Sequence, residues 1–177
     1  MKPHAFTRFL VLKHSESVGM TFTVLARGGC QAKPLLCYTL NMSNKLGFTH
    51  AIRVYYENTD AGGVVYHSQY LNFMERARTE WLRHLGFEQT DLRDQLQVLF
   101  VVHSMQIQFK SPAKFNDMLS INSNLTQMGR GSFECHQTIL RDQQILLNAH
   151  VKIACINAIS FKPMGIPAHI KFALESA

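Results

Sequence analysis

No stretch of the 177-residue sequence approaches the ~18 consecutive apolar residues that a membrane-spanning helix needs. Together with a mean hydropathy of −0.06, this excludes an integral membrane protein. No internal repeat of fixed period is found, which excludes a repeat solenoid. Charged residues are few, at 17%, whereas hydrophobic residues reach 46%, which excludes a disordered chain and predicts one domain with a sizeable core.

Cysteine is also scarce, with four residues at Cys30, Cys37, Cys135 and Cys155. None of them forms a C-x-x-C pair, and no histidine spacing indicates a zinc site. Cys135 and Cys155 lie in apolar, strand-like stretches. We therefore expect no metal and interpret the cysteines as buried, reduced thiols of a cytoplasmic protein.

The net charge of +6 is concentrated at the N-terminus, because residues 1–41 carry +4 of it. The rest of the chain is nearly balanced and shows no basic stripe with interleaved aromatic residues. A nucleic-acid partner is therefore not expected, whereas a weak positive charge suits an anionic small ligand.

Residues 1–41 also lack a steady hydrophobic period. The apolar run Phe9–Leu12 is too short for a secretory signal. The acid-poor composition is typical of an organelle transit peptide, but we favour a natural start at Met42, because the patterned region begins a few residues later. The expected organisation is a poorly ordered or over-called extension (1–41) followed by one domain (42–177).

The patterned region alternates between strand and helix signals. Apolar residues recur at three- and four-residue spacing over 68–85, which predicts a long helix with Ser68 as N-cap and Gly86 at the C′ position. Strands are expected at 48–56, 97–110, 118–127, 132–141 and 145–159, with a short terminal helix at 168–174. We interpret the last four strands as a meander and predict an α+β fold, in which an antiparallel sheet of about five strands wraps round one helix. Its exposed edge is expected to pair with a second subunit.

The segment before the long helix contains the residues most suited to catalysis. Asp60 lies in a glycine-containing loop, and a helix start offers unpaired N–H groups that can stabilise an oxyanion. A carboxylate beside such a site is the minimum apparatus for acyl transfer. His67 and Tyr66 lie at the same helix entrance. An aspartate in such a loop is also a common turn former, so the residues alone leave both roles open.

The segment Tyr55–Arg83, with Thr-Asp-Ala-Gly-Gly-Val-Val-Tyr-His followed by Phe-Met-Glu-Arg-Ala-Arg, resembles the signature of the YbgC-type acyl-CoA thioesterases. These are hotdog-fold proteins encoded with the Tol–Pal cell-envelope system, within the 4-hydroxybenzoyl-CoA thioesterase family. The resemblance extends from about Gly47 to about Pro163. It implies a hotdog fold in which the long helix is wrapped by the sheet, and homodimers or homotetramers with active sites at the dimer interface.

The resemblance also implies roles for individual residues. Asp60 falls on the catalytic carboxylate, acting as nucleophile or as general base. His67 falls at the helix start, where its backbone N–H polarises the thioester carbonyl. Tyr56, Gly63 and Tyr66 fall on positions that shape the loop and the substrate pocket. Asn58 stands where related sequences often have Asp, outside the minimal motif.

The implied substrate is an acyl-CoA, hydrolysed to a free acid and CoA. A thioester needs no metal or redox cofactor, since its carbonyl is electrophilic and the thiolate leaves well; CoA is part of the substrate. Ser132 is a further substrate-binding candidate. The candidates for contact with the CoA phosphates are Lys110, Lys114, Arg130 and Lys152.

Two other functions stay open. One is a non-catalytic module of the Tol–Pal machinery that binds acyl chains or acyl-carrier protein, although such a module has no need for Asp60. The other is a hotdog dehydratase acting on a thioester, against which the Asp60–His67 spacing argues. Acyl-carrier protein also remains open as the physiological acyl carrier.

Overall fold

The computed structural model describes residues 11–14, 21–24 and 47–177, and the chain divides into two units, Met1–Lys45 and Leu46–Ala177. In the first unit, β1 (Val11–His14) pairs antiparallel with β2 (Thr21–Val24), a pairing that the sequence did not predict. The rest of the expected extension, the proposed start at Met42, and both Cys30 and Cys37 lie outside the described residues.

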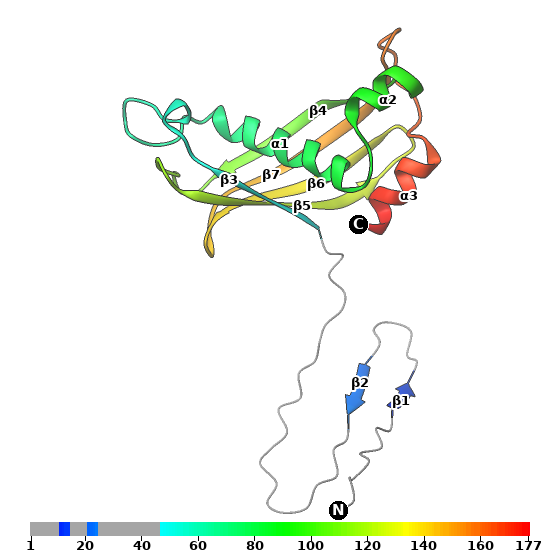
Figure 1. Ribbon diagram of the computed structural model, residues 1–177, viewed down its shortest axis with the longest axis horizontal. Helices are drawn as coiled ribbons and strands as arrows, with labels where there is room; N and C mark the ends of the chain where they lie inside the picture. The colour runs from blue at the N-terminus through cyan, green and yellow to red at the C-terminus, as the bar shows by residue number, and fades with distance from the viewer. Residues whose placement is uncertain (1–10, 15–20, 25–46) are drawn as a thin grey trace, which may run out of the picture. The chain divides into compact units, whose positions relative to one another are not determined.

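The second unit is an α+β fold built on a five-stranded antiparallel sheet. Its strands are β3 (Phe48–Arg53), β4 (Val98–Phe109), β5 (Met118–Met128), β6 (Ser132–Arg141) and β7 (Gln144–Asn157). Figure 1 shows the long helix α1 (Gln69–His84) lying across one face of this sheet. Shorter elements are the 3₁₀ turn η1 (Tyr56–Asn58) and the helices α2 (Gln89–Leu96) and α3 (Ala168–Ser176). The predicted fold class and the predicted central helix are confirmed.

The core lies between α1 and the sheet because each element buries one side. In β6 alternate residues are buried, and Phe133, Cys135 and Ile139 face α1. On α1 the fully buried side chains include Phe73 and Met74. Full burial of a side chain of this size stabilises the fold by about 1.5–3 kcal/mol.

The predicted meander is wrong, since the strand order is β3-β5-β6-β7-β4. β4 pairs with β7 along its whole length, from Val98 opposite Asn157 to Phe109 opposite Leu147, so β5 lies between β3 and β6. The connection 110–117 does not close a hairpin. Instead it packs on the loop that precedes α1, where the backbone N–H of Val65 donates to the carbonyl of Ala113 at 2.9 Å. Both β3 and β4 are consequently edge strands.

One of the two predicted caps of α1 is confirmed in full, and the other only in its position. Gly86 adopts φ +87°, and its N–H donates to the Arg83 carbonyl while that of Phe87 donates to the Leu82 carbonyl, each at 2.9 Å. This is the predicted glycine-terminated C-cap. Ser68 occupies the N-cap position, but its side chain makes no capping hydrogen bond, because its backbone is already helical at φ −71° and ψ −20°.

Cys135 and Cys155 are free and buried, as predicted. Burial raises the pKa of the Cys135 thiol to about 11, which keeps it protonated and unreactive at neutral pH. Of the helices in the described ranges, none combines the length and apolar character required to span a bilayer.

Candidate active site

The loop that carries Asp60 folds back on itself at the entrance to α1. The N–H of Asp60 donates to the Val64 carbonyl, and the N–H of Tyr66 donates to the Asn58 carbonyl, each at 2.9 Å. Gly63 adopts φ +73°, a conformation that L-residues rarely take, to complete the turn. As a result, Asp60 and the segment that leads into α1 belong to one compact loop. Asp60 lies in its turn, and Tyr66 lies at its base.

The Asp60 carboxylate is exposed, and one of its oxygens is held in place. Oδ1 accepts a hydrogen bond from the backbone N–H of Gly62 at 2.8 Å. This is the local bond of a turn-forming aspartate. It also orients the carboxylate and leaves Oδ2 without a hydrogen-bond partner among residues 47–177.

His67 lies two residues before the start of α1, and its side chain is exposed. Its ring lies against that of Tyr66, with centroids 4.3 Å apart. Within the described part of the chain, its backbone N–H donates to no acceptor. A free N–H at the positive end of a helix dipole is suited to stabilise an oxyanion.

The 110–117 connection supports this loop from the side. The buried N–H of Ala113 donates to the hydroxyl oxygen of Tyr70 on α1 at 2.8 Å, and burial raises the pKa of Tyr70. Tyr56, otherwise exposed, places its ring 4.3 Å from that of Phe115. Tyr56, Gly63, Tyr66 and His67 therefore lie in or beside the same loop as Asp60.

Asn58 is a positioning residue that the sequence analysis missed. It is only 2% exposed. Its Oδ1 accepts from the Tyr55 N–H at 2.8 Å, and its Nδ2 donates to Gln69 Oε1 at 3.2 Å. The side chain thus ties the start of the loop to the first residue of α1. An amide can do this because it donates and accepts at once, which a carboxylate cannot.

Asp117 fixes the far end of the connection. Its Oδ2 accepts from the Lys114 N–H at 2.8 Å and from Arg141 Nη1 at 2.7 Å. Burial is the largest single influence and raises the pKa of Asp117, but these hydrogen bonds and the charge of Arg141 together hold that pKa below its ordinary value.

Ser132 is not near Asp60 within one chain. It opens β6, whereas the Asp60 loop lies near the other end of that strand, where Arg141 pairs with Leu119. β6 has 10 residues, so its two ends are about 30 Å apart at a rise of ~3.3 Å per residue. Arg130 lies in the turn beside Ser132, and Lys152 is paired with Glu134 at 3.3 Å. Only Lys110 and Lys114 lie at the Asp60 end.

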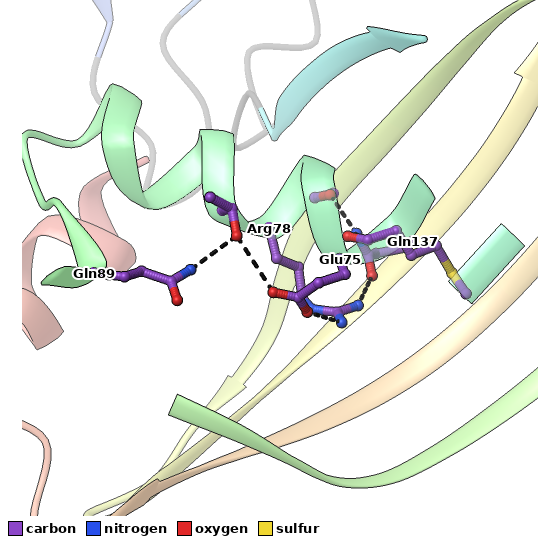
Figure 2. A network of polar contacts seen from close by, with 7 residues as sticks. Glu75, Arg78, Gln89 and Gln137 are labelled. Atoms are coloured by element: carbon purple, nitrogen blue, oxygen red, sulfur yellow. Dashed lines mark hydrogen bonds and ion pairs between the residues drawn. The ribbon is translucent and has the colours of Figure 1, made fainter. Parts of the chain in front are cut away.

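A narrow pocket of about 30 Å³ opens between α1 and β4. Its polar wall is formed by Glu75 and Arg78, and its apolar wall by Trp81, Phe100 and Phe133. Arg78 is 8% exposed and is held by Glu75 Oε2 at 2.5 Å and by Gln137 Oε1 at 2.7 Å (Figure 2). The three- and four-residue spacing of α1 puts Arg78 on the same face as Met74 and Trp81. An arginine on a helix is usually solvated, so its burial and its contact with Gln137 were not predicted.

The hydrogen bonds of Arg78 continue into the core through Gln137. Gln137, fully buried on β6, donates through Nε2 to Ser123 Oγ at 2.9 Å and to the Met74 carbonyl at 3.2 Å. On the other side, Gln89 donates to Thr79 (Figure 2). Among residues 47–177, no buried side-chain nitrogen or oxygen is left without a partner.

Comparison with known proteins identifies the family. The model of the thioesterase-like superfamily matches residues 54–174. The acyl-CoA thioesterase YbgC of Haemophilus influenzae is 42% identical over 129 residues, covering 73% of this chain and 95% of that protein. The acyl-CoA thioester hydrolase YbgC of Escherichia coli O6:H1 is 44% identical over 124 residues, covering 70% and 92%.

A solved structure agrees with these relatives. The probable thioesterase from Bartonella henselae superposes with a TM-score of 0.65 at 38% identity, covering 67% of this chain and 98% of that one. The region that the superfamily model matches includes the Asp60 loop, α1 and every strand of the sheet from β4 onward. The chain therefore belongs to the thioesterase-like superfamily, and within it to the hotdog-fold YbgC thioesterases.

Proposed function

We propose that this chain hydrolyses acyl-CoA thioesters to a free acid and CoA, with Asp60 as the catalytic carboxylate. The observation that carries the proposal is the exposed Asp60 carboxylate, oriented through Oδ1 by Gly62 in a loop that folds onto the entrance to α1. The names of the YbgC relatives supply the substrate class.

Two routes are compatible with this arrangement. As nucleophile, Asp60 attacks the thioester carbonyl, CoA leaves as its thiolate, and water hydrolyses the resulting mixed anhydride. As general base, Asp60 takes a proton from water as its oxygen attacks the carbonyl carbon. The tetrahedral intermediate then collapses, the C–S bond breaks, and the leaving CoA thiolate takes up the proton. In both routes the His67 N–H stabilises the oxyanion of the tetrahedral intermediate, a contribution typically worth ~10²–10³ in rate. Neither route uses a metal or redox cofactor.

The complete site requires a second copy of the chain. β4 is an edge strand that exposes the apolar side chains of Val101, Val102 and Phe109. Such an edge favours pairing with another strand. Antiparallel pairing of two β4 strands about a two-fold axis would bring the Val101 end of one copy to the Phe109 end of the other.

Such pairing supports the proposed role of Ser132 as a substrate-binding residue. Ala154 is the register partner of both Ser132 and Val101, and Phe109 contacts Tyr70 near the entrance to α1. Two-fold pairing of β4 would therefore bring Ser132 and Arg130 of one copy toward Asp60 and Lys114 of the other. We propose a homodimer with two shared sites. Two such dimers can form the homotetramer that the resemblance implies.

A thiol-release assay on a panel of acyl-CoAs tests the function directly. We expect wild-type protein to release CoA and Asp60→Ala to release none above background, with Asp91→Ala on α2 as the control. Binding of acyl-CoA without CoA release by the wild-type protein would indicate a non-catalytic binding module. Loss of water from a 3-hydroxyacyl-CoA without release of CoA would indicate a dehydratase. The same assay with acyl-carrier protein thioesters tests the alternative carrier.

A further inference from the structure

Two histidines face each other on the side of the sheet turned away from α1. His136 on β6 and His150 on β7 are register partners in the antiparallel ladder. The chain neighbours of His136, Cys135 and Gln137, are buried, and so are the neighbours of His150, Ala149 and Val151. Alternation along each strand therefore places both histidines on the outer face. The two imidazole rings have centroids 4.7 Å apart and planes inclined by 44°.

In the two neighbouring rows of β6 and β7, the side chains on this face are already paired. On one side, Lys152 contacts Glu134 at 3.3 Å. On the other, Thr138 donates to Asn148 at 3.2 Å. In contrast, neither His136 nor His150 has a hydrogen-bond partner for its ring nitrogens among the described residues. His136 is half-buried and His150 is exposed, so solvent and ions reach the pair.

We propose that His136 and His150 together bind one divalent transition-metal ion, Zn²⁺ or Cu²⁺. Imidazole is a preferred ligand of these ions, whereas Mg²⁺ prefers oxygen. With metal–nitrogen bonds of ~2.0–2.1 Å, two rings on adjacent coordination positions of one ion have centres on the order of 5 Å apart. The observed separation of 4.7 Å matches this distance.

The proposed ion would bridge β6 and β7 and take its remaining ligands from water. No described group of three or more His, Cys, Asp or Glu side chains gathers at one point, so the two imidazoles are the only ligands of these four types among the described residues. It lies on the opposite face of the sheet from α1 and is therefore separate from the Asp60 loop. The sequence does not predict this site, because His136 and His150 are 14 residues apart and become neighbours only through the register of β6 and β7.

Isothermal titration of the full chain with ZnCl₂ tests the proposal, with MgCl₂ as the hard-ion control. The comparison uses wild type, His136→Gln, His150→Gln and, as a matched control, His169→Gln, which removes an exposed histidine on α3. Because the second ligand makes binding partly intramolecular, we expect each pair variant to weaken the Zn²⁺ site by about 10²-fold. His169→Gln should leave that site unchanged, and MgCl₂ should not bind at it.

Electron paramagnetic resonance of the Cu²⁺-loaded protein is an independent test. The nitrogen hyperfine splitting in this spectrum gives the number of imidazole nitrogens that are bound to the ion. We expect two imidazole nitrogens in the wild type and one in each pair variant. Unchanged melting temperatures without metal would establish that the variants fold. Identical Zn²⁺ isotherms for wild type and both pair variants would overturn the proposal, as would a Cu²⁺ spectrum that His136→Gln does not alter.

Discussion

Arg141 and Asp117 form an ion pair of 2.7 Å at the end of β6 that lies nearest the Asp60 loop. The same Asp117 oxygen accepts the Lys114 N–H, so one carboxylate closes the 110–117 connection and ties it to the sheet. Because that connection hydrogen-bonds to Val65, the pair supports the loop without belonging to it.

The lowered pKa of Asp117 predicts a pH-dependent contribution to stability. A carboxyl group whose pKa is lower in the folded state stabilises the protein fully above its unfolded pKa, and this contribution is lost as the pH falls through the folded pKa. We expect Asp117→Asn to reduce the free energy of unfolding by about 1–3 kcal/mol at pH 7. The difference from wild type should shrink below pH ~4. Urea denaturation of both proteins at pH 7 and pH 3 measures this difference in unfolding free energy at each pH. A difference that is the same at the two pH values would contradict a lowered pKa of Asp117.

The amide of Gln137 links Arg78 to Ser123 in the core. Gln137→Leu preserves the approximate volume but removes every hydrogen bond that the amide makes, leaving buried polar atoms unpaired. We expect a loss of about 2–4 kcal/mol in the free energy of unfolding. Gln127→Leu, at an exposed position on β5, is the matched control and should change stability little. Equal effects of the two substitutions in chemical denaturation would show that the network is not stabilising.

Alanine variants of Gly63 and Gly86 distinguish an effect on stability from an effect on the shape of the Asp60 loop. Both have positive φ, +73° and +87°, and an added Cβ would meet no atom within 4 Å at either position. Alanine at each should therefore cost a similar ~1–2 kcal/mol of stability through backbone strain alone. Only Gly63→Ala should also lower kcat, because it distorts the turn that holds Asp60. Equal kcat values for the two variants would argue against a role for the loop shape.

The proposed dimer is tested at β4. Val102→Glu places a charge on the exposed edge and should shift the protein to monomer in light scattering, with loss of CoA release. Ala51→Glu places the same charge on the other edge strand, β3, and should leave both unchanged. A Val102→Glu monomer with full activity would contradict a site shared between two copies.

The sequence predicted those features of the fold that depend on local pattern. The helix expected over 68–85 is α1 at Gln69–His84, and the strand expected over 132–141 is β6. The partner of β4 could not be predicted in the same way, since strand order depends on long-range packing. α2 was missed because Leu92 is its one buried residue, which leaves too weak a helical period.

The candidate site was predictable only where its residues are adjacent in the chain. The resemblance located Asp60, Gly63, Tyr66 and His67 in one segment, and the loop brings them together. The hydrogen bond from Ala113 to Tyr70 joins residues far apart in the sequence, as does the contact of Arg78 with Gln137. No periodicity indicates such pairs, because they arise from strand register and helix packing.

The most direct test of the account is the kcat of Asp60→Asn on a good acyl-CoA substrate. Asparagine keeps the acceptor for the Gly62 N–H, so the turn should persist while the negative charge is lost. We predict that kcat falls by several orders of magnitude while acyl-CoA still binds, since Asp60 acts mainly in the transition state. Asp142→Asn, at an exposed turn, should have no effect, and His67→Ala should be milder, because the proposed contact uses the backbone. A near-wild-type kcat for Asp60→Asn would show that Asp60 only forms the turn.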